Sequence, residues 1–211
     1  MVATAVSVSA YRYVVILFAG FLQRVGSPQN GILQLRDRLY RSIAGPDFLI
    51  DYYPWYIGAD EIARMISELD AECEDLLLRR LRVMIVGFSW GGATAVQVCS
   101  RLARQGICVD QLTLCDPVAR HGRLGWLRAL LPWSRLVVPD SVLRLTVFRQ
   151  RHPRFRPTPP FFFPGGQRVV SGANTRINGV FELDLEHWEM DSAPDFHRVV
   201  FAEANRLKGS T

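Results

Sequence analysis

The sequence has few of the residues that build metal and redox sites. Its four cysteines, at positions 73, 99, 108 and 115, do not have the spacing of metal ligands. Cys99 and Cys115 fall in segments that we expect to be buried, which is typical of reduced thiols in a reducing compartment. The sequence therefore predicts neither a metal site nor a cofactor.

Long apolar runs and clustered positive charge are also missing. The apolar stretch at 13–22 is too short to span a bilayer, and it lacks the basic start and the cleavage site of a signal peptide. The net charge of +5 comes almost entirely from arginines scattered along the chain, which argues against a nucleic-acid-binding stripe. We therefore expect a cytoplasmic protein with no transmembrane segment and no nucleic-acid partner.

What is present is an ordinary globular balance of residues. The 211 residues are 49% apolar and 21% charged, which suits a single domain over 1–211, and no internal repeat is visible. Apolar runs and amphipathic stretches alternate, which predicts a mostly parallel sheet with helices on both faces, an α/β fold. The expected strands are 11–18, 48–53, 82–86, 109–115 and 141–150, and the expected helices are 30–42, 59–80, 93–102 and one that starts near 192.

Three segments depart from this alternation. Residues 117–138 are apolar and aromatic, and we interpret them as a cap or lid over the site, with a plain packing helix as the alternative. Residues 153–166 form a proline-rich aromatic loop that we expect to line an apolar pocket or fold over the core. Residues 169–185 are expected to hold a last strand or a hairpin, with Asn178-Gly179 as the turn signal.

The most informative stretch is Gly87-Phe88-Ser89-Trp90-Gly91, which follows an apolar run and leads into a helical pattern. This pattern predicts a nucleophile elbow, a sharp strand-to-helix turn that exposes a serine hydroxyl. Glycines are needed at the flanking positions because neighbouring chains come so close that a Cβ would clash. Ser89 is therefore the candidate nucleophile.

A serine nucleophile needs a base, and the chain has only four histidines. His187 lies after the last expected strand and before the final helix, on a loop at the edge where a parallel sheet binds its ligands. His121, His152 and His197 lie in a cap-like stretch, in an arginine-rich segment and inside the final helix. We therefore predict His187 as the base.

The orienting carboxylate is found in the same way. Asp110 and Asp140 precede their strands, at the wrong edge of the sheet. Glu182, Asp184 and Glu186 alternate along a strand close to the histidine, which is typical of a solvated face. Asp116 remains, since it ends the strand after the elbow helix and is followed by Pro117; its alternative role is that of a strand-end aspartate bonded to loop amides.

The remaining site predictions concern the substrate. The developing oxyanion needs fixed donors, and we expect these to be the backbone N–H of Trp90 and that of Phe21, or failing that Leu22, in the loop after the first strand. Apolar side chains near the expected mouth are the candidate substrate-binding residues: Leu22, Trp126, Trp133 and Phe162.

With these residues assigned, the chain resembles the α/β-hydrolase superfamily in a small version. The resemblance runs from the first strand and its Gly20-Phe21 loop through the elbow to His187 and the last helix. Asp116-Pro117 is similar to the Asp-Pro of those lipases whose acid follows the strand next to the elbow. Two features depart from the family: the oxyanion loop lacks a His-Gly pair, and the usual acid position one strand later is empty.

The resemblance and the residues together predict a serine hydrolase without metal or organic cofactor. The expected substrate is a small or lipid-like carboxylic ester or thioester with an apolar acyl part. Two alternatives stay open. The same triad could serve an amidase or peptidase, and the scaffold could be a binding or interaction module without turnover.

Overall fold

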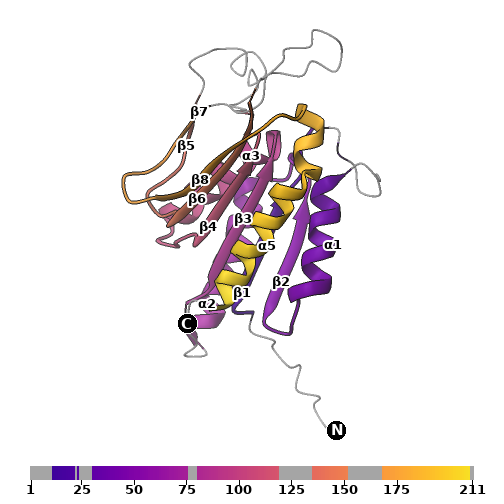
Figure 1. Cartoon of the computed structure of the whole chain (residues 1–211). Coiled ribbons are helices and arrows are strands. Elements are labelled where there is room, and N and C mark those ends of the chain that lie inside the picture. Colours follow the sequence, from indigo (N-terminus) through magenta and orange to yellow (C-terminus); the bar gives the residue numbers. More distant parts are fainter. Residues whose placement is uncertain are drawn as a thin grey trace.

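Strands and helices alternate along most of the chain (Figure 1). A computed structural model describes residues 11–21, 23, 30–75, 80–118, 135–151 and 168–209. The elements in chain order are β1 (Tyr13–Phe18), α1 (Gly31–Ile43), β2 (Phe48–Tyr53), α2 (Ala59–Asp75), β3 (Arg82–Phe88), α3 (Trp90–Arg104), β4 (Gln111–Cys115), β5 (Arg135–Val137), β6 (Arg144–Gln150), β7 (Arg168–Val170), β8 (Arg176–Leu183), the 3₁₀ helix η1 (His187–Ser192) and α5 (Pro194–Gly209).

One sheet of six strands organises the described part of the molecule. Its strand order is β2-β1-β3-β4-β6-β8, and every pairing within it is parallel. The predicted α/β class with a mostly parallel central sheet is therefore confirmed. Because all six strands point the same way, the loops that follow them gather at one edge of the sheet. Strands β5 and β7 pair separately, also in parallel.

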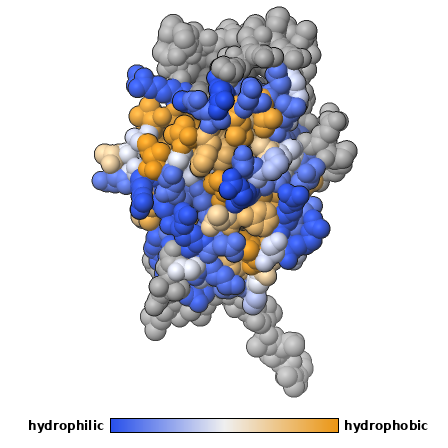
Figure 2. Space-filling view, viewed as in Figure 1, coloured by the Kyte–Doolittle hydropathy of each residue, from blue (hydrophilic) through white to orange (hydrophobic). Residues whose placement is uncertain are grey.

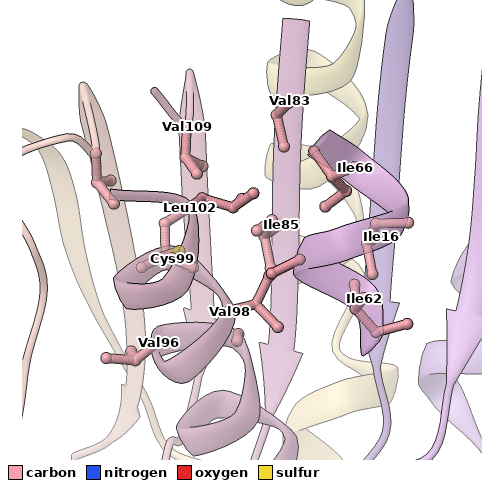
Figure 3. Packing of buried hydrophobic residues seen from close by; sticks show 14 of the residues in the cluster. Ile16, Ile62, Ile66, Val83, Ile85, Val96, Val98, Cys99, Leu102 and Val109 are labelled. Carbon is pink, nitrogen blue, oxygen red and sulfur yellow. The ribbon is translucent and has the colours of Figure 1, made fainter. Parts of the chain in front are cut away.

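Helices cover both faces of this sheet, and each face has its own apolar core. On one face, α2 and α3 pack against alternate residues of the central strands, among them Ile16, Val83 and Ile85 (Figure 3). On the other face, α1 and α5 pack against the intervening residues, such as Val15 and Met84. Strands β1 and β4 are buried along their whole length because both of their faces are covered. This explains why β1 is continuously apolar, whereas β4 has Gln111 and Thr113 on one face, where both bond to Glu203 of α5.

The end of the chain differs from the sequence-based expectation in two places. The predicted turn at Asn178-Gly179 is wrong, because both residues lie inside the single strand β8. Pairing along β6 shifts there, so that Asn178 is an extra bulged residue whose side-chain amide donates to Gln111 Oε1 at 3.1 Å. Strand β5, at the end of segment 117–138, was also missed; residues 119–134 of that segment and the loop 153–166 lie outside the described residues.

The face that α1 and α5 cover is mixed in polarity. Figure 2 shows hydrophobic residues gathered beside α5, over the region of β6 and β8. Strand β8 forms the edge of the sheet, and its exposed apolar side chains are Ile177, Val180 and Phe181. Among the described helices, none combines the length and the apolar character that a membrane crossing requires.

Candidate active site

Ser89 lies between the last residue of β3 and the first residue of α3. Its backbone has φ 53° and ψ −122°, which is a strained conformation for a residue with a side chain. The flanking glycines permit the turn, since a Cβ at Gly87 would lie 2.6 Å from the Gly91 carbonyl oxygen, and one at Gly91 would lie 2.4 Å from the Ala19 carbonyl oxygen. The chain thus forms the strand–turn–helix geometry that the elbow motif requires.

His187 begins the short helix η1, just beyond the end of β8. Its Nε2 lies 2.8 Å from Ser89 Oγ, and its ring stacks on Phe88 with 5.0 Å between the centroids. A capping box at the start of this helix, formed by Glu186 and Glu189, fixes the turn that carries the imidazole. The stacked Phe88 ring and the capped turn of η1 thus hold the imidazole beside the Ser89 hydroxyl.

Asp116 follows the last residue of β4 and is fully buried, with a φ of 43°. Its Oδ2 lies 2.5 Å from His187 Nδ1, and its Oδ1 accepts a hydrogen bond from the backbone N–H of Gln150 at 3.3 Å. An ionised carboxylate can only accept, so Nδ1 carries a proton and Nε2 is left with a lone pair for the Ser89 hydroxyl. Hydroxyl, imidazole and carboxylate thus form one hydrogen-bonded row.

The loop after β1 passes directly beside this row. A Cβ at Gly20 would lie 2.8 Å from the Phe88 ring and 3.0 Å from Ser89 Cβ, so only glycine allows the loop to come so close. Phe21, the next residue, packs its ring on that of Trp90 at 4.4 Å between centroids. Trp90 is the first residue of α3, where backbone N–H groups point out of the helix end. The loop that carries Phe21 and the first residue of α3, Trp90, thus adjoin at the serine turn, and the two expected oxyanion donors are backbone N–H groups of these residues.

Aromatic residues that the sequence analysis missed extend this surface. Trp55 packs against both Trp90, at 4.8 Å, and Phe21, at 5.7 Å between ring centroids, and Tyr56 packs on Trp55. Thr94 Oγ1 donates to the Trp55 carbonyl oxygen at 2.6 Å, which fixes this loop on α3, the helix that follows Ser89. We call Phe21, Trp55 and Trp90 the aromatic cluster. The available signal was the run Tyr52-Tyr53-Pro54-Trp55-Tyr56 at the end of the strand next to β1.

The four expected substrate-binding residues cannot be placed beside this cluster. Leu22, Trp126, Trp133 and Phe162 all lie outside the described residues. Two of the rejected histidines, His121 and His152, also lie outside them. The remaining rejected histidine, His197, is buried in α5, and its Nε2 lies 2.7 Å from the Asp191 carbonyl oxygen. It supports the turn that carries His187 but does not contact the serine.

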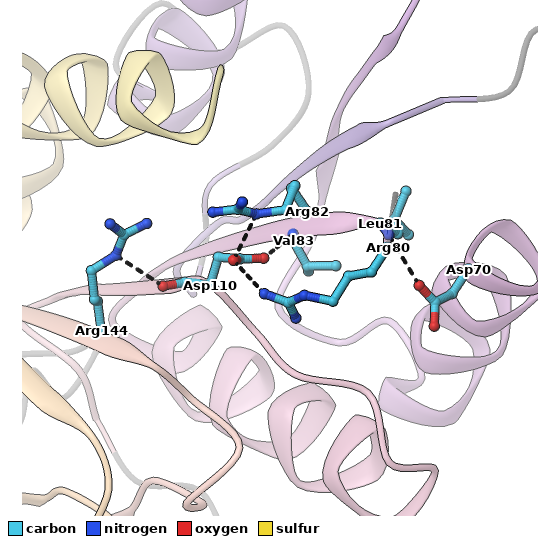
Figure 4. A network of polar contacts seen from close by, with 7 residues as sticks. All are labelled: Asp70, Arg80, Leu81, Arg82, Val83, Asp110 and Arg144. Carbon is cyan, nitrogen blue, oxygen red and sulfur yellow. Dashed lines mark hydrogen bonds and ion pairs between the residues drawn. The ribbon is translucent and has the colours of Figure 1, made fainter. Parts of the chain in front are cut away.

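Two of the rejected carboxylates lie outside the strand on which they were expected: β8 ends at Leu183, so Asp184 and Glu186 follow it, and Glu186 is the N-cap of η1. Asp110 precedes β4 and binds two arginines at the opposite end of that strand from Asp116 (Figure 4). Glu182 is exposed and pairs with Arg149. Cys115, which adjoins Asp116, is a buried free thiol; burial and the neighbouring carboxylates raise its pKa, so it stays protonated and is no rival nucleophile.

Comparison with known proteins gives similarity at the level of the fold. No family model and no curated protein matches the chain. Solved structures that match it include a hydrolase of the α/β superfamily from Xanthomonas campestris, with a TM-score of 0.49, 13% identity, and coverage of 94% of this chain and 99% of that one. They also include α/β hydrolase domain-containing protein 10 from mouse (TM-score 0.49, 10% identity, coverage 93% and 89%). The RedJ thioesterase from Streptomyces coelicolor is a third (TM-score 0.41, 14% identity, coverage 93% and 86%).

These neighbours are all α/β-hydrolase-fold proteins, as the resemblance in the sequence implied. At 10–16% identity, no activity or substrate passes from these proteins to this one. The chemistry therefore has to be argued from the residues of this chain.

Proposed function

We propose that this chain is a serine hydrolase that cleaves a carboxylic ester or thioester through an acyl-enzyme intermediate. One observation carries the proposal. Ser89 Oγ, the His187 imidazole and the Asp116 carboxylate form a continuous row, with 2.8 Å and 2.5 Å between successive donors and acceptors. The row stands at the edge where the strands end and the helix after β3 begins, which is where an α/β sheet binds its ligands.

The proposed reaction follows from which groups of that row carry a proton and which can accept one. His187 Nε2 takes the hydroxyl proton as Ser89 Oγ bonds to the carbonyl carbon, and the Asp116 carboxylate stabilises the imidazolium that forms. Backbone N–H groups of Trp90 and Phe21 would stabilise the oxyanion. The C–O or C–S bond then breaks as the imidazolium returns the proton to the leaving group. In the second half of the reaction, His187 Nε2 takes a proton from water as the water oxygen bonds to the acyl carbon. The bond between the acyl carbon and Ser89 Oγ then breaks, and the imidazolium returns the proton to Oγ.

An apolar acyl part is supported by the aromatic cluster. Phe21 is 38% exposed, and the rings of Trp55 and Trp90 are only partly buried beside the serine turn. Exposed aromatic carbon next to a nucleophile favours an apolar partner, because covering it removes that surface from water. The free cysteines fit the reducing cytoplasm that we propose as the location.

A fluorophosphonate probe tests this proposal. We expect a mass increase on Ser89 in the native chain and no labelling in Ser89→Ala or His187→Ala. Ser100→Ala is the matched control, because Ser100 Oγ donates to the Val96 carbonyl oxygen within α3 and lies away from the histidine. A folded native chain that stays unlabelled would favour the non-catalytic binding module instead.

Substrate class needs a second measurement. The amidase or peptidase alternative uses the same three residues, so labelling does not separate it from an esterase. A panel of p-nitrophenyl esters and p-nitroanilides with matched acyl groups does, by the ratio of kcat/KM values. We expect the esters to be preferred, and a preference for anilides would move the assignment to the amidase.

A further inference from the structure

A second buried carboxylate lies on the turn that carries His187, and the triad does not use it. Asp191 is fully buried in η1, four residues after the histidine. Burial raises its pKa, while hydrogen bonds from Gln23, from the N-terminus of α1 and from Ser192 act in the opposite direction. A buried acid with so many donors has a specific task, since burying an unneeded charge is costly.

The donors to Asp191 come from two other parts of the chain. The Ile32 backbone N–H, in the first turn of α1, donates to Oδ2 at 3.3 Å, where the helix dipole favours a negative charge. Gln23 Nε2 donates to the same oxygen at 2.5 Å. Gly31 fits so closely under the turn that a Cβ there would lie 2.5 Å from the Asp191 carbonyl oxygen. The turn of His187 is therefore fastened to the segment that follows β1.

The other end of the Gln23 side chain reaches the oxyanion loop. Its Oε1 accepts a hydrogen bond from the Gly20 backbone N–H at 2.7 Å, and the backbone N–H of Gln23 donates to the Gly20 carbonyl oxygen at 3.3 Å. Both ends of the amide are thus assigned by chemistry, because a backbone N–H can only donate and a carboxylate can only accept. Gln23 closes a tight turn over 20–23 and ties it to Asp191.

We infer that Gln23 and Asp191 are positioning residues that hold the oxyanion loop in register with the turn of His187. This inference rests on the proposed hydrolase function. The loop places the Phe21 amide and the turn places the base, so one bridge fixes the distance between the two groups that act on the same carbonyl. Preorganised donors are what make an oxyanion hole effective, and loss of one typically lowers kcat by about 10²–10³-fold.

The first variant is Gln23→Glu, measured on p-nitrophenyl butyrate. It replaces the donor to Asp191 by a second carboxylate, and the two charges repel in a buried contact. We expect kcat to fall about 100-fold while KM changes by less than about threefold, because the loss acts on the transition state. Gln105→Glu is the matched control, since Gln105 is exposed and caps the end of α3 that is far from Ser89.

The reciprocal double variant, Gln23→Glu with Asp191→Asn, separates positioning from mere structure. The new carboxylate at position 23 still accepts from Gly20 N–H, and the new amide nitrogen at position 191, in the place of Oδ2, donates to it. The 3.3 Å hydrogen bond from the Ile32 N–H to Oδ2 is lost in this variant. The hydrogen bond is restored with donor and acceptor exchanged, so we expect kcat to recover to within about tenfold of the native value. Asp195→Asn, an exposed position in α5, is the control for the second change.

Two results would overturn the inference while leaving the hydrolase intact. One is a folded Gln23→Glu chain whose kcat stays within about threefold of the native enzyme. The other is a folded double variant that shows no recovery. Should Gln23→Glu fail to fold, Gln23→Met removes both hydrogen bonds without adding charge, and it must lower kcat in the same way. Absence of fluorophosphonate labelling in the native chain is a different outcome, because it overturns the hydrolase itself.

Discussion

Strand β4 has a buried aspartate beyond each of its ends, and the two carboxylates have different kinds of partner. Asp110, 1% exposed, binds Arg80 at 2.7 Å and Arg82 at 2.8 Å and accepts from the Val83 N–H. Asp116, fully buried, binds the His187 imidazole. A guanidinium keeps its charge at any ordinary pH, whereas an imidazole can gain and lose a proton. The two equally buried carboxylates therefore differ in whether their partner can change its charge.

The position of each carboxylate follows from the direction of the sheet. Asp110 stands where the strands begin, and the arginines that neutralise it come from the start of the neighbouring strand β3 and from the residue two before it (Figure 4). Asp116 stands where the strands end, beside the loops that follow β3 and β8. The comparison predicts that matched substitutions at the two ends separate activity from stability.

Asp116→Asn should have the largest effect on activity. The amide can donate to Nδ1, which leaves the proton on Nε2 and removes the acceptor for the Ser89 hydroxyl. We expect kcat for p-nitrophenyl butyrate to fall about 10⁴-fold with little change in the thermal midpoint. Near-normal turnover in this variant would show that the orienting acid lies elsewhere.

Asp110→Asn should give the opposite result. The amide oxygen can still accept from the Val83 N–H, but two guanidinium groups lose their counter-charge. Because Arg80 and Arg82 are 44% and 23% exposed, solvent screens part of this loss, and we expect about 2 kcal/mol less stability in urea unfolding. Activity per folded molecule should be unchanged. A loss of kcat without a loss of stability would break the comparison.

Trp55→Ala tests the aromatic cluster at the site end of the sheet. Removing this ring takes apolar surface from beside the nucleophile without changing the triad. We expect kcat/KM for p-nitrophenyl octanoate to fall about tenfold while that for the acetate stays nearly constant. Tyr40→Ala is the control, because Tyr40 is exposed on α1 and is not part of the cluster. Equal losses for both esters would mean that the cluster does not contact the acyl chain.

A third buried acid, Glu203 of α5, contacts β4 between the two aspartates. We expect its substitution to have the smallest effect on the protein. Glu203 of α5 accepts from Thr113 Oγ1 at 2.5 Å, from Gln111 Nε2 at 3.0 Å and from Thr146. Burial raises its pKa above that of the unfolded chain, so the folded protein binds the proton more tightly. Between the ordinary carboxyl pKa, about 4.3, and the raised value, stability therefore falls as pH rises.

Glu203→Gln removes this dependence. The native chain should gain stability relative to the variant as the pH falls from about 7 to about 5, measured by urea unfolding at each pH. Glu68→Gln, at an exposed position of α2, is the control. The difference in stability between this variant and the native chain should not change with pH over the same range. A native chain that loses stability relative to Glu203→Gln as the pH falls from about 7 to about 5 would contradict the stated direction of the pKa shift.

Much of the fold could be predicted because local signals agreed with the tertiary structure. The strand at Phe48–Tyr53 has the predicted bounds, and β1, β3 and β4 each differ from the expectation by two residues at one end. Asn178-Gly179 shows the limit of such signals. This pair favours a tight turn in isolation, but here the side chain of Asn178 bonds to Gln111 of β4, across the intervening strand β6. A strand bulge satisfies it as well as a turn would.

The candidate site likewise contains residues that could be predicted from the sequence and residues that could not. Ser89, Asp116 and His187 could be chosen because each stands at the end of a strand or just beyond it, and the direction of a parallel sheet follows from alternating strands and helices. Gln23 and Asp191 carry no local signal. A glutamine in a loop and an aspartate in a short helix are ordinary until the fold brings them within 2.5 Å of each other.

The sequence by itself determined the α/β architecture, the serine turn and the edge of the sheet where the candidate residues meet, because periodicity, glycine spacing and chain direction are local properties. Only the tertiary structure decided which groups touch. The bridge from Gly20 through Gln23 to Asp191 joins atoms from segments 168 residues apart, and the aromatic cluster draws on the loops after three different strands. Contacts of this kind depend on how the faces of the sheet are covered, which no single stretch of the chain encodes.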